Sequence, residues 1–320
     1  MYFLGFDTAK AKYDVSCVDE HGVEQWRDMV PNTTEAVAVL LLTATGHYGE
    51  DNLTCVVEST GCYHYPLLDV AEALAIPCKV YNPILTKQHI KSSVRGKKTD
   101  RTDALAIARL GLRGEGRLHS PEPYRTLKYY LRCYQKIGAI DLMLKLHCAH
   151  LTSVLDDEMS PVMQTSLEAV QESVLAARKA LYADMQLAAA GDLYVLLQTI
   201  PGIGPYIAAS LIGEIQDMQR FPSSRAVVAY SGLDPKIRQS GQNQGGKGRL
   251  TKRGSSYLRR SIFIAANVSR QFDPQFKALY DKKRAEGKSH TVATCVVARK
   301  LLAVVGSVWL SGERYKVPEN

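Results

Sequence analysis

The chain has 320 residues, of which 46% are hydrophobic and 22% charged, so it is globular and too long for one ordinary core. Lysines and arginines number 40 against 32 acidic residues, and the net charge of +8 favours a polyanionic partner such as nucleic acid over an acidic protein or a small metabolite. The 7 cysteines are scattered and form no Cys-x-x-Cys pair, so the sequence indicates neither a disulfide framework nor a structural zinc site.

The first 120 residues predict an α/β domain. Three β-rich runs, at residues 2–7, 13–18 and 23–30, are separated by short polar stretches and predict a meander. The pattern then alternates between helices and strands: helix 34–45, strand 53–58, helix 65–74, strand 78–81 and helical segments from about 86 to 112. A β-β-β-α-β-α-β-α order implies a mixed sheet with helices on its faces, and ribonuclease H-like folds use this order.

Residues 121–190 are expected to form a helical coiled-coil arm. Apolar residues recur at steps of three and four from Ile137 to Leu155, and Ser160-Pro161 has the form of a second helix start. Two long helices with narrow apolar stripes are typical of a pairing surface. The sequence favours dimerisation and packing against the chain's own domains about equally.

Residues 191–320 are expected to form a mainly helical domain. A helix from residue 192 and another ending near 215 flank the turn Ile200-Pro-Gly-Ile-Gly-Pro205, and further helices are predicted near 255–270, 273–286 and 289–310. The turn resembles a helix-hairpin-helix, in which Gly202 and Gly204 would bring backbone N–H groups to a phosphate. A tight joint between two packed helices is the alternative.

Four carboxylates are candidates for one metal site. Asp7 and Glu58 each end an apolar strand, and Asp100 and Asp103 lie three residues apart where a helix begins. Four acids converging at a strand edge would suit Mg²⁺, which prefers oxygen ligands, and paired Mg²⁺ ions assist phosphoryl transfer. Each acid taken singly could instead be a cap or a charge that complements a helix dipole.

A basic loop follows, and we expect it to bind nucleic acid. Its cations, with no acid among them, are Lys236, Arg238, Lys247, Arg249, Lys252 and Arg253. Ser240 lies among them and would be a nucleophile if this positive field stabilised the phosphate it attacks. By chemistry alone, a role as phosphate hydrogen-bond donor is favoured, and Ser231, Ser255 and Ser256 are equal candidates.

Membrane association is not expected. No uninterrupted apolar run reaches the roughly 18 residues that a membrane span requires, and the start lacks the features of a signal peptide. We therefore expect a cytoplasmic protein with no membrane partner.

The chain resembles the bridge-RNA-guided transposases of bacterial insertion sequences, which join a RuvC-like amino-terminal domain to a carboxy-terminal transposase domain. The motifs that carry the resemblance are FLGFDTAK, VVEST, KTDRTDA, IPGIGPYIA and GLDPKIRQSG. The resemblance implies that Asp7, Glu58, Asp100 and Asp103 bind Mg²⁺ and that Ser240 attacks DNA to give a covalent phosphoserine. It implies as partners a donor and a target DNA, a guide (bridge) RNA, and further copies in a dimer or tetramer. In such an assembly the acids of one subunit work beside the serine of another, and the helical arm holds the subunits together.

Two other functions are open from the residues. A metal-dependent RuvC-like junction endonuclease would hydrolyse DNA with the four acids alone. A noncatalytic nucleic-acid scaffold would use only the hairpin and the basic loop.

Overall fold

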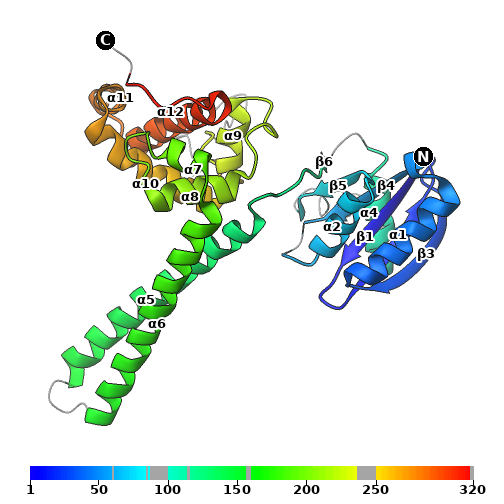
Figure 1. Cartoon of the computed structure of the whole chain (residues 1–320), viewed down its shortest axis with the longest axis horizontal. Coiled ribbons are helices and arrows are strands. Elements are labelled where there is room, and N and C mark those ends of the chain that lie inside the picture. The colour runs from blue at the N-terminus through cyan, green and yellow to red at the C-terminus, as the bar shows by residue number, and fades with distance from the viewer. Residues whose placement is uncertain are drawn as a thin grey trace, which may run out of the picture. The chain divides into compact units, whose positions relative to one another are not determined.

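The computed structural model describes the chain except for residues 60, 84–85, 87–99, 114–115, 156–159, 236–249 and 318–320, and gives the backbone alone for residues 100–102. Two compact units divide the chain, Met1–Pro121 and Glu122–Asn320 (Figure 1). The first matches the α/β domain expected for residues 1–120. The second contains both the helical arm and the carboxy-terminal helices, and the division of this part at residue 190 stays a prediction.

The first unit is built on a six-stranded mixed sheet. Its strands are β1 (Tyr2–Thr8), β2 (Lys12–Val18), β3 (Glu24–Pro31), β4 (Leu53–Glu58), β5 (Cys78–Tyr81) and β6 (Arg117–Leu118), in the order β3-β2-β1-β4-β5-β6. The meander β1-β2-β3 is antiparallel, β4 and β5 run parallel to β1, and β6 is antiparallel to β5. This is the ribonuclease H-like arrangement predicted from the sequence, with the short β6 as an unpredicted addition.

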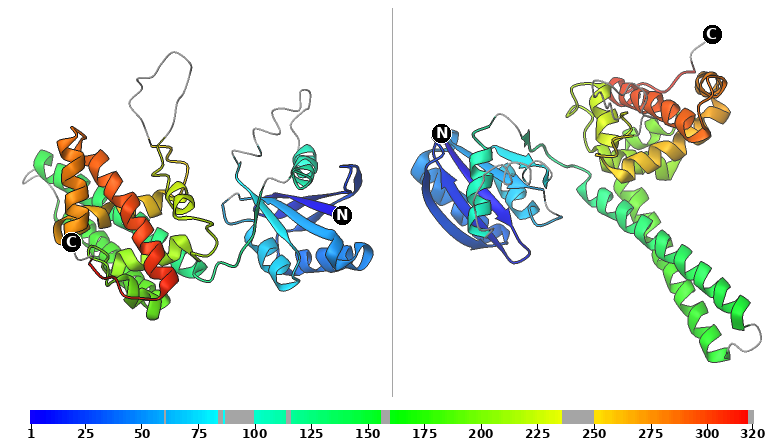
Figure 2. Two further views of the ribbon diagram at one scale, coloured as in Figure 1. Left: turned by 90° about the horizontal axis from the view of Figure 1, so that it is seen from above. Right: turned by 180° about the vertical axis from the view of Figure 1, so that it is seen from behind.

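Helices cover both faces of this sheet. On one face lie α1 (Thr34–Tyr48) and α2 (Tyr65–Ala73), which bury Leu4, Phe6 and Val57 among others, and a short 3₁₀ turn, η1 (Glu50–Asn52), precedes β4. On the other face α4 (Asp100–Leu110) packs over Phe3 and Val56 (Figure 2). Successive residues of a strand point to opposite faces. The sheet therefore has a core on each side, and odd-numbered positions of β1 face α4.

The second unit is helical. Its helices are α5 (Arg125–Leu155), α6 (Pro161–Ala189), α7 (Asp192–Leu197), α8 (Pro205–Ile215), α9 (Ser224–Ser231), α10 (Ser256–Phe272), α11 (Pro274–Ala285) and α12 (His290–Ser311). Figure 1 shows α5 and α6 side by side as a long pair that extends from the other helices of this unit. The near ends of that pair belong to the core of the unit, where Leu127, Leu131 and Met185 are buried. The predicted boundaries of α10, α11 and α12 are confirmed to within about two residues.

One helix in the described part of the chain, α12, is long and apolar enough to cross a membrane by length and composition. Half of its most apolar window is buried inside the unit, where α12 packs against α9, α10 and α11. It is packed as a core helix of the helical unit.

Candidate active site and nucleic-acid interface

Asp7 and Glu58 lie at one edge and on one face of the sheet. β1 and β4 are parallel neighbours, and the register of paired residues ends at Phe6 and Val57. Asp7 and Glu58 therefore follow at the same carboxyl edge. Phe6 and Val57 both belong to the core under α1 and α2. Because side chains alternate, Asp7 and Glu58 both point to the face that α4 covers.

Helix α4 runs antiparallel to β1 and brings its acidic start to this edge. A Cβ at Gly5 would lie 2.5 Å from the Ala104 carbonyl oxygen, and a Cβ at Gly111 would lie 2.5 Å from the Phe3 ring. The end of α4 is thus over the start of β1, and its first turn is over the strand's carboxyl end. Asp100 and Asp103 are in that first turn. Any side chain at position 5 would push α4 off the sheet, which explains the glycine.

Hydrogen bonds fix Glu58 and the far end of α4. The buried hydroxyl of Thr86 donates to Glu58 Oε2. From β5, the Tyr81 hydroxyl donates to the Leu110 carbonyl at 2.7 Å and Lys79 Nζ donates to the Gly111 carbonyl at 2.9 Å. These bonds supply partners to the orphan carbonyls at the helix end and hold α4 in register with the sheet.

A fifth acid, Asp14, was missed by the sequence reasoning. It is the direct cross-strand partner of Asp7 on β2, and opposite residues of an antiparallel pair share a face. Lys12 Nζ lies 2.9 Å from Asp14 Oδ2 and balances this charge. The spacing of six residues between Asp7 and Asp14, across the short turn that joins two strands, could have predicted that they face each other.

The candidate ligands at this edge are carboxylates. Carboxylate oxygens are hard ligands of the kind Mg²⁺ selects. Among the side chains that the structure describes, no three of His, Cys, Asp and Glu converge closely enough to hold a metal ion. This includes Asp7, Glu58 and Asp103, which do not form such a group by themselves. The Asp100 side chain lies outside the described atoms, and the four-acid site stays a prediction.

The glycines of the predicted hairpin have different surroundings. Gly202 has a positive φ of 89°, and a Cβ there would lie 2.7 Å from the Ala265 carbonyl oxygen of α10. Packing therefore accounts for this glycine. Gly204 is exposed at the N-cap of α8 with open space around its Cα, and a phosphate contact there stays a prediction.

The two ends of the basic loop are tied together. Pro235 and Leu250 form an antiparallel bridge, and the Thr251 N–H donates to the Asp234 carbonyl at 3.0 Å. Lys252 and Arg253 follow on the surface. Ser240, Lys236, Arg238, Lys247 and Arg249 lie outside the described residues. We call residues 232–235 and 250–255 the loop root.

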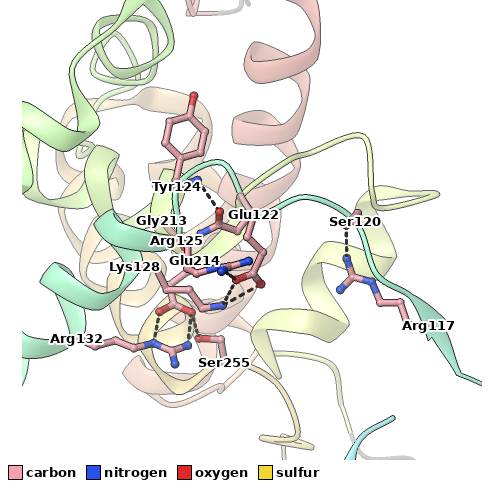
Figure 3. Close-up of polar contacts among 11 residues, drawn as sticks. Arg117, Ser120, Glu122, Tyr124, Arg125, Lys128, Arg132, Gly213, Glu214 and Ser255 are labelled. Carbon is pink, nitrogen blue, oxygen red and sulfur yellow. Dashed lines mark hydrogen bonds and ion pairs between the residues drawn. The ribbon is translucent and has the colours of Figure 1, made fainter. Parts of the chain in front are cut away.

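The loop root is anchored to the arm through a buried carboxylate, Glu214 of α8 (Figure 3). Its two oxygens accept from Arg132 Nε at 2.8 Å and from Arg132 Nη2 at 3.1 Å, a bidentate pair with α5. The Ser255 hydroxyl also donates to Glu214, at 2.8 Å, and accepts from the Leu258 N–H as the N-cap of α10. Sequence reasoning missed this pair, although Glu214 is the one charged residue in the run PYIAASLIGEI and a buried acid needs a partner.

Replacing Glu214 by Ala is expected to lower the free energy of unfolding by about 3 kcal/mol, because Arg132 and Ser255 lose their shared acceptor in a buried setting. Urea denaturation followed by circular dichroism measures this loss. Glu214→Gln should lose less, because the amide oxygen still accepts. Glu286→Ala is the control, since its pair with Lys283 is on the surface and should matter by less than about 1 kcal/mol. Equal losses in the two alanine variants would contradict the anchoring role.

The sheet has the strand order of a ribonuclease H-like fold and carries carboxylates at the adjoining ends of β1 and β4. Two family models match the chain, one described as "Transposase" over residues 4–137 and one as "Transposase IS116/IS110/IS902 family" over residues 194–281. The chain belongs to this family of insertion-sequence transposases, which are DNA strand transferases.

Individual relatives agree with the family. The "Pilin gene-inverting protein" of Moraxella lacunata is 24% identical over 324 residues, covering 94% of both chains. The "Transposase for insertion sequence element IS1111A" of Coxiella burnetii is 25% identical and covers 98% of this chain and 91% of that protein. The "Insertion element IS110 uncharacterized 43.6 kDa protein" of Streptomyces coelicolor is 32% identical over 161 residues, but the match spans 38% of that protein. Among solved structures, Thermus thermophilus RuvC aligns over 37% of this chain and 100% of its own, with 14% identity and a TM-score of 0.30.

Proposed function

We propose that this chain is a DNA recombinase that cuts and rejoins strands through a covalent phosphoserine at Ser240, assisted by Mg²⁺ bound at Asp7, Glu58, Asp100 and Asp103. The observation that carries the metal half of the proposal is the shared face and edge of Asp7 and Glu58, beneath the first turn of α4. Acids placed together without a cation would repel one another, so a site for a divalent cation accounts for them.

The proposed step is a transesterification at phosphorus. The Ser240 oxygen forms a bond to the phosphorus of a phosphodiester, the bond from phosphorus to one deoxyribose oxygen breaks, and the hydroxyl proton passes through solvent to the released strand. A hydroxyl of another strand then attacks the same phosphorus, which frees Ser240 and joins the new strands. Each of the two steps exchanges one phosphoester bond for another, so no energy-rich cofactor is needed. Bound Mg²⁺ would neutralise charge on the phosphate oxygens.

The contacts of Ser231 and Ser255 count against two of the three rival serines. Ser231 is buried and its hydroxyl donates to the Val228 carbonyl at 2.6 Å. Ser255 is engaged on both sides, by Glu214 and by the Leu258 N–H. Of the three alternatives, Ser256 alone is exposed at the start of α10.

Self-association through the arm is part of the proposal. Along α5 and α6 an apolar hollow of about 360 Å³ is lined by Ile137, Ile140 and Val170 among others. On the arm's surface Leu142, Met143 and Leu146 are exposed by 58%, 67% and 64% of their area. Exposed apolar surface of this extent on α5 and α6 would be buried if the arms of several copies of the chain packed together as a helical bundle. We further propose a guide RNA as partner and a cytoplasmic location, on the resemblance stated above.

Trapping the phosphoserine tests the proposal. The full-length protein, purified with any RNA that accompanies it, is incubated with a supercoiled plasmid bearing the element's ends, with Mg²⁺ or with EDTA. The mixture is then denatured in detergent. We expect a protein–DNA adduct in the Mg²⁺ sample, and mass spectrometry of the digested adduct should locate a nucleotide on the peptide containing Ser240. Hydrolysed ends with no adduct would instead identify a junction endonuclease, and binding with no cleavage would identify a scaffold.

A further inference from the structure

A basic hollow lies at the loop root of the second unit. Its volume is about 490 Å³, and it is lined by Arg225 at the start of α9, Arg299 and Lys300 of α12, and Asp234 and Pro235 of the loop root. Arg225 and Lys300 are exposed and Arg299 is half-buried. The hollow is thus open to a ligand from solvent.

The positive charges of this hollow outnumber the acids in its lining, which are represented by Asp234 alone among the described residues. Within the described part of the chain, none of the three cations is within ion-pair distance of an acid. The one carboxylate in the lining, Asp234, accepts a hydrogen bond of 2.5 Å from the Thr251 hydroxyl, which serves the loop root. Three gathered positive charges repel one another, and an anion in the hollow would relieve that repulsion.

A second hollow, with two arginines in its lining, also borders the loop root. Its volume is about 350 Å³, and Leu250, Arg259 and Arg260 are in its lining. Cys295 of α12 lines this hollow and Arg299 lines the first. Residues four apart share a helix face, so the two hollows follow one another along α12. Arg259 is held in place by its hydrogen bond of 3.3 Å to the Ser231 carbonyl.

We propose that these two hollows seat successive backbone phosphates of the DNA strand on either side of the loop root. This inference rests on the proposed function, because the loop that carries the proposed nucleophile starts and ends between them. The first hollow offers Arg225, Arg299 and Lys300, and the second offers Arg259 and Arg260 beside apolar side chains. Cations of this kind contact phosphates and do not distinguish bases. They therefore bind DNA without reading its sequence, and position it for the loop.

The double variant Arg299→Ala/Lys300→Ala tests the first hollow. Its affinity for a fluorescent DNA duplex of arbitrary sequence is measured by anisotropy between about 50 and 200 mM salt. Each lost phosphate contact should reduce the slope of log affinity against log salt by about 1 and weaken binding roughly fivefold at physiological salt. The matched control, Lys277→Ala/Lys282→Ala, removes two exposed cations of α11, outside both hollows. Thermal unfolding should change little in both, since Lys277, Lys282 and Lys300 are exposed and Arg299 is half-buried.

Equal binding losses in the test and control variants would overturn the proposal, because net charge would then explain them. A loss confined to an RNA duplex of the same length would overturn it too. The serine role is tested separately by adduct formation at saturating DNA. If the test variant forms the adduct and binds DNA with unchanged affinity, the hollows do not bind DNA, and the proposed function is unaffected. If the test variant binds DNA more weakly but the unaltered protein forms no adduct, the hollows bind DNA and the proposed serine mechanism is refuted.

Discussion

Replacing Ser240 by Ala is expected to abolish the covalent protein–DNA adduct while leaving DNA affinity and its salt dependence unchanged. A methyl group has no oxygen with which to bond phosphorus, so no residual rate through this residue is possible. The cations that bind the backbone are kept, and loss of one hydroxyl from a basic loop should change stability by no more than about 0.5 kcal/mol. Denaturing gels of the reaction mixture measure the adduct, and anisotropy measures binding.

Two other serines serve as controls for this variant. Ser256→Ala removes an exposed hydroxyl next to the second hollow and should leave the adduct in place. Ser255→Ala removes the N-cap of α10 and should cost about 1 kcal/mol of stability, again with the adduct retained. An adduct that persists in Ser240→Ala, or that disappears in Ser256→Ala instead, would show that the nucleophile was wrongly assigned.

The fold of the first unit could be predicted because its signals are local. Short β-rich runs separated by polar turns fixed the strands, and β5 was predicted with the bounds that the structure gives. The helices between parallel strands follow from the need for a crossover. β6 escaped prediction because two exposed residues carry no periodic pattern, and their strand character comes from pairing with β5.

The acids could be placed at one edge from sequence, but their surroundings could not. Strand ends of parallel neighbours meet at one edge by topology alone. The position of Asp14 opposite Asp7 depends on the register of a hairpin, and the Thr86 bond to Glu58 depends on a contact between distant segments. Gly5 shows the same limit, since the need for glycine comes from the backbone of α4 lying directly above it.

Most helices of the second unit were predicted, but α9 (Ser224–Ser231) was missed, and so were the long-range pairs. Caps such as Ser160, Ser255 and Ser289 mark helix starts that local rules find. Arg132 and Glu214 are 82 positions apart, and nothing in the local pattern of either helix pairs them. Gly202 was interpreted as a phosphate contact, whereas its close packing on α10 is a tertiary reason for glycine that a motif cannot reveal.

Asp7→Asn is expected to lower strand cleavage by about 10³-fold, because a carboxylate that holds the cation becomes a neutral amide and the metal's contribution amounts to several kcal/mol. The adduct is measured against time in Mg²⁺. A second readout does not depend on activity: Mg²⁺ or Mn²⁺ should raise the melting temperature of the unaltered protein, since a ligand that binds only the folded state stabilises it. That shift should be lost in Asp7→Asn.

The change in stability of the metal-free protein on Asp7→Asn distinguishes a cation ligand from a structural residue. Asp7 sits beside Asp14 and on the same face and edge as Glu58, so removing one negative charge should leave the metal-free protein as stable or make it more stable. Asp28→Asn, the same change at an exposed site on β3, should alter neither cleavage nor the metal-dependent shift. If Asp7→Asn destabilised the metal-free protein and kept the metal-dependent shift, Asp7 would be a structural residue. The metal would then be bound without it, and the four-acid site would have to be abandoned.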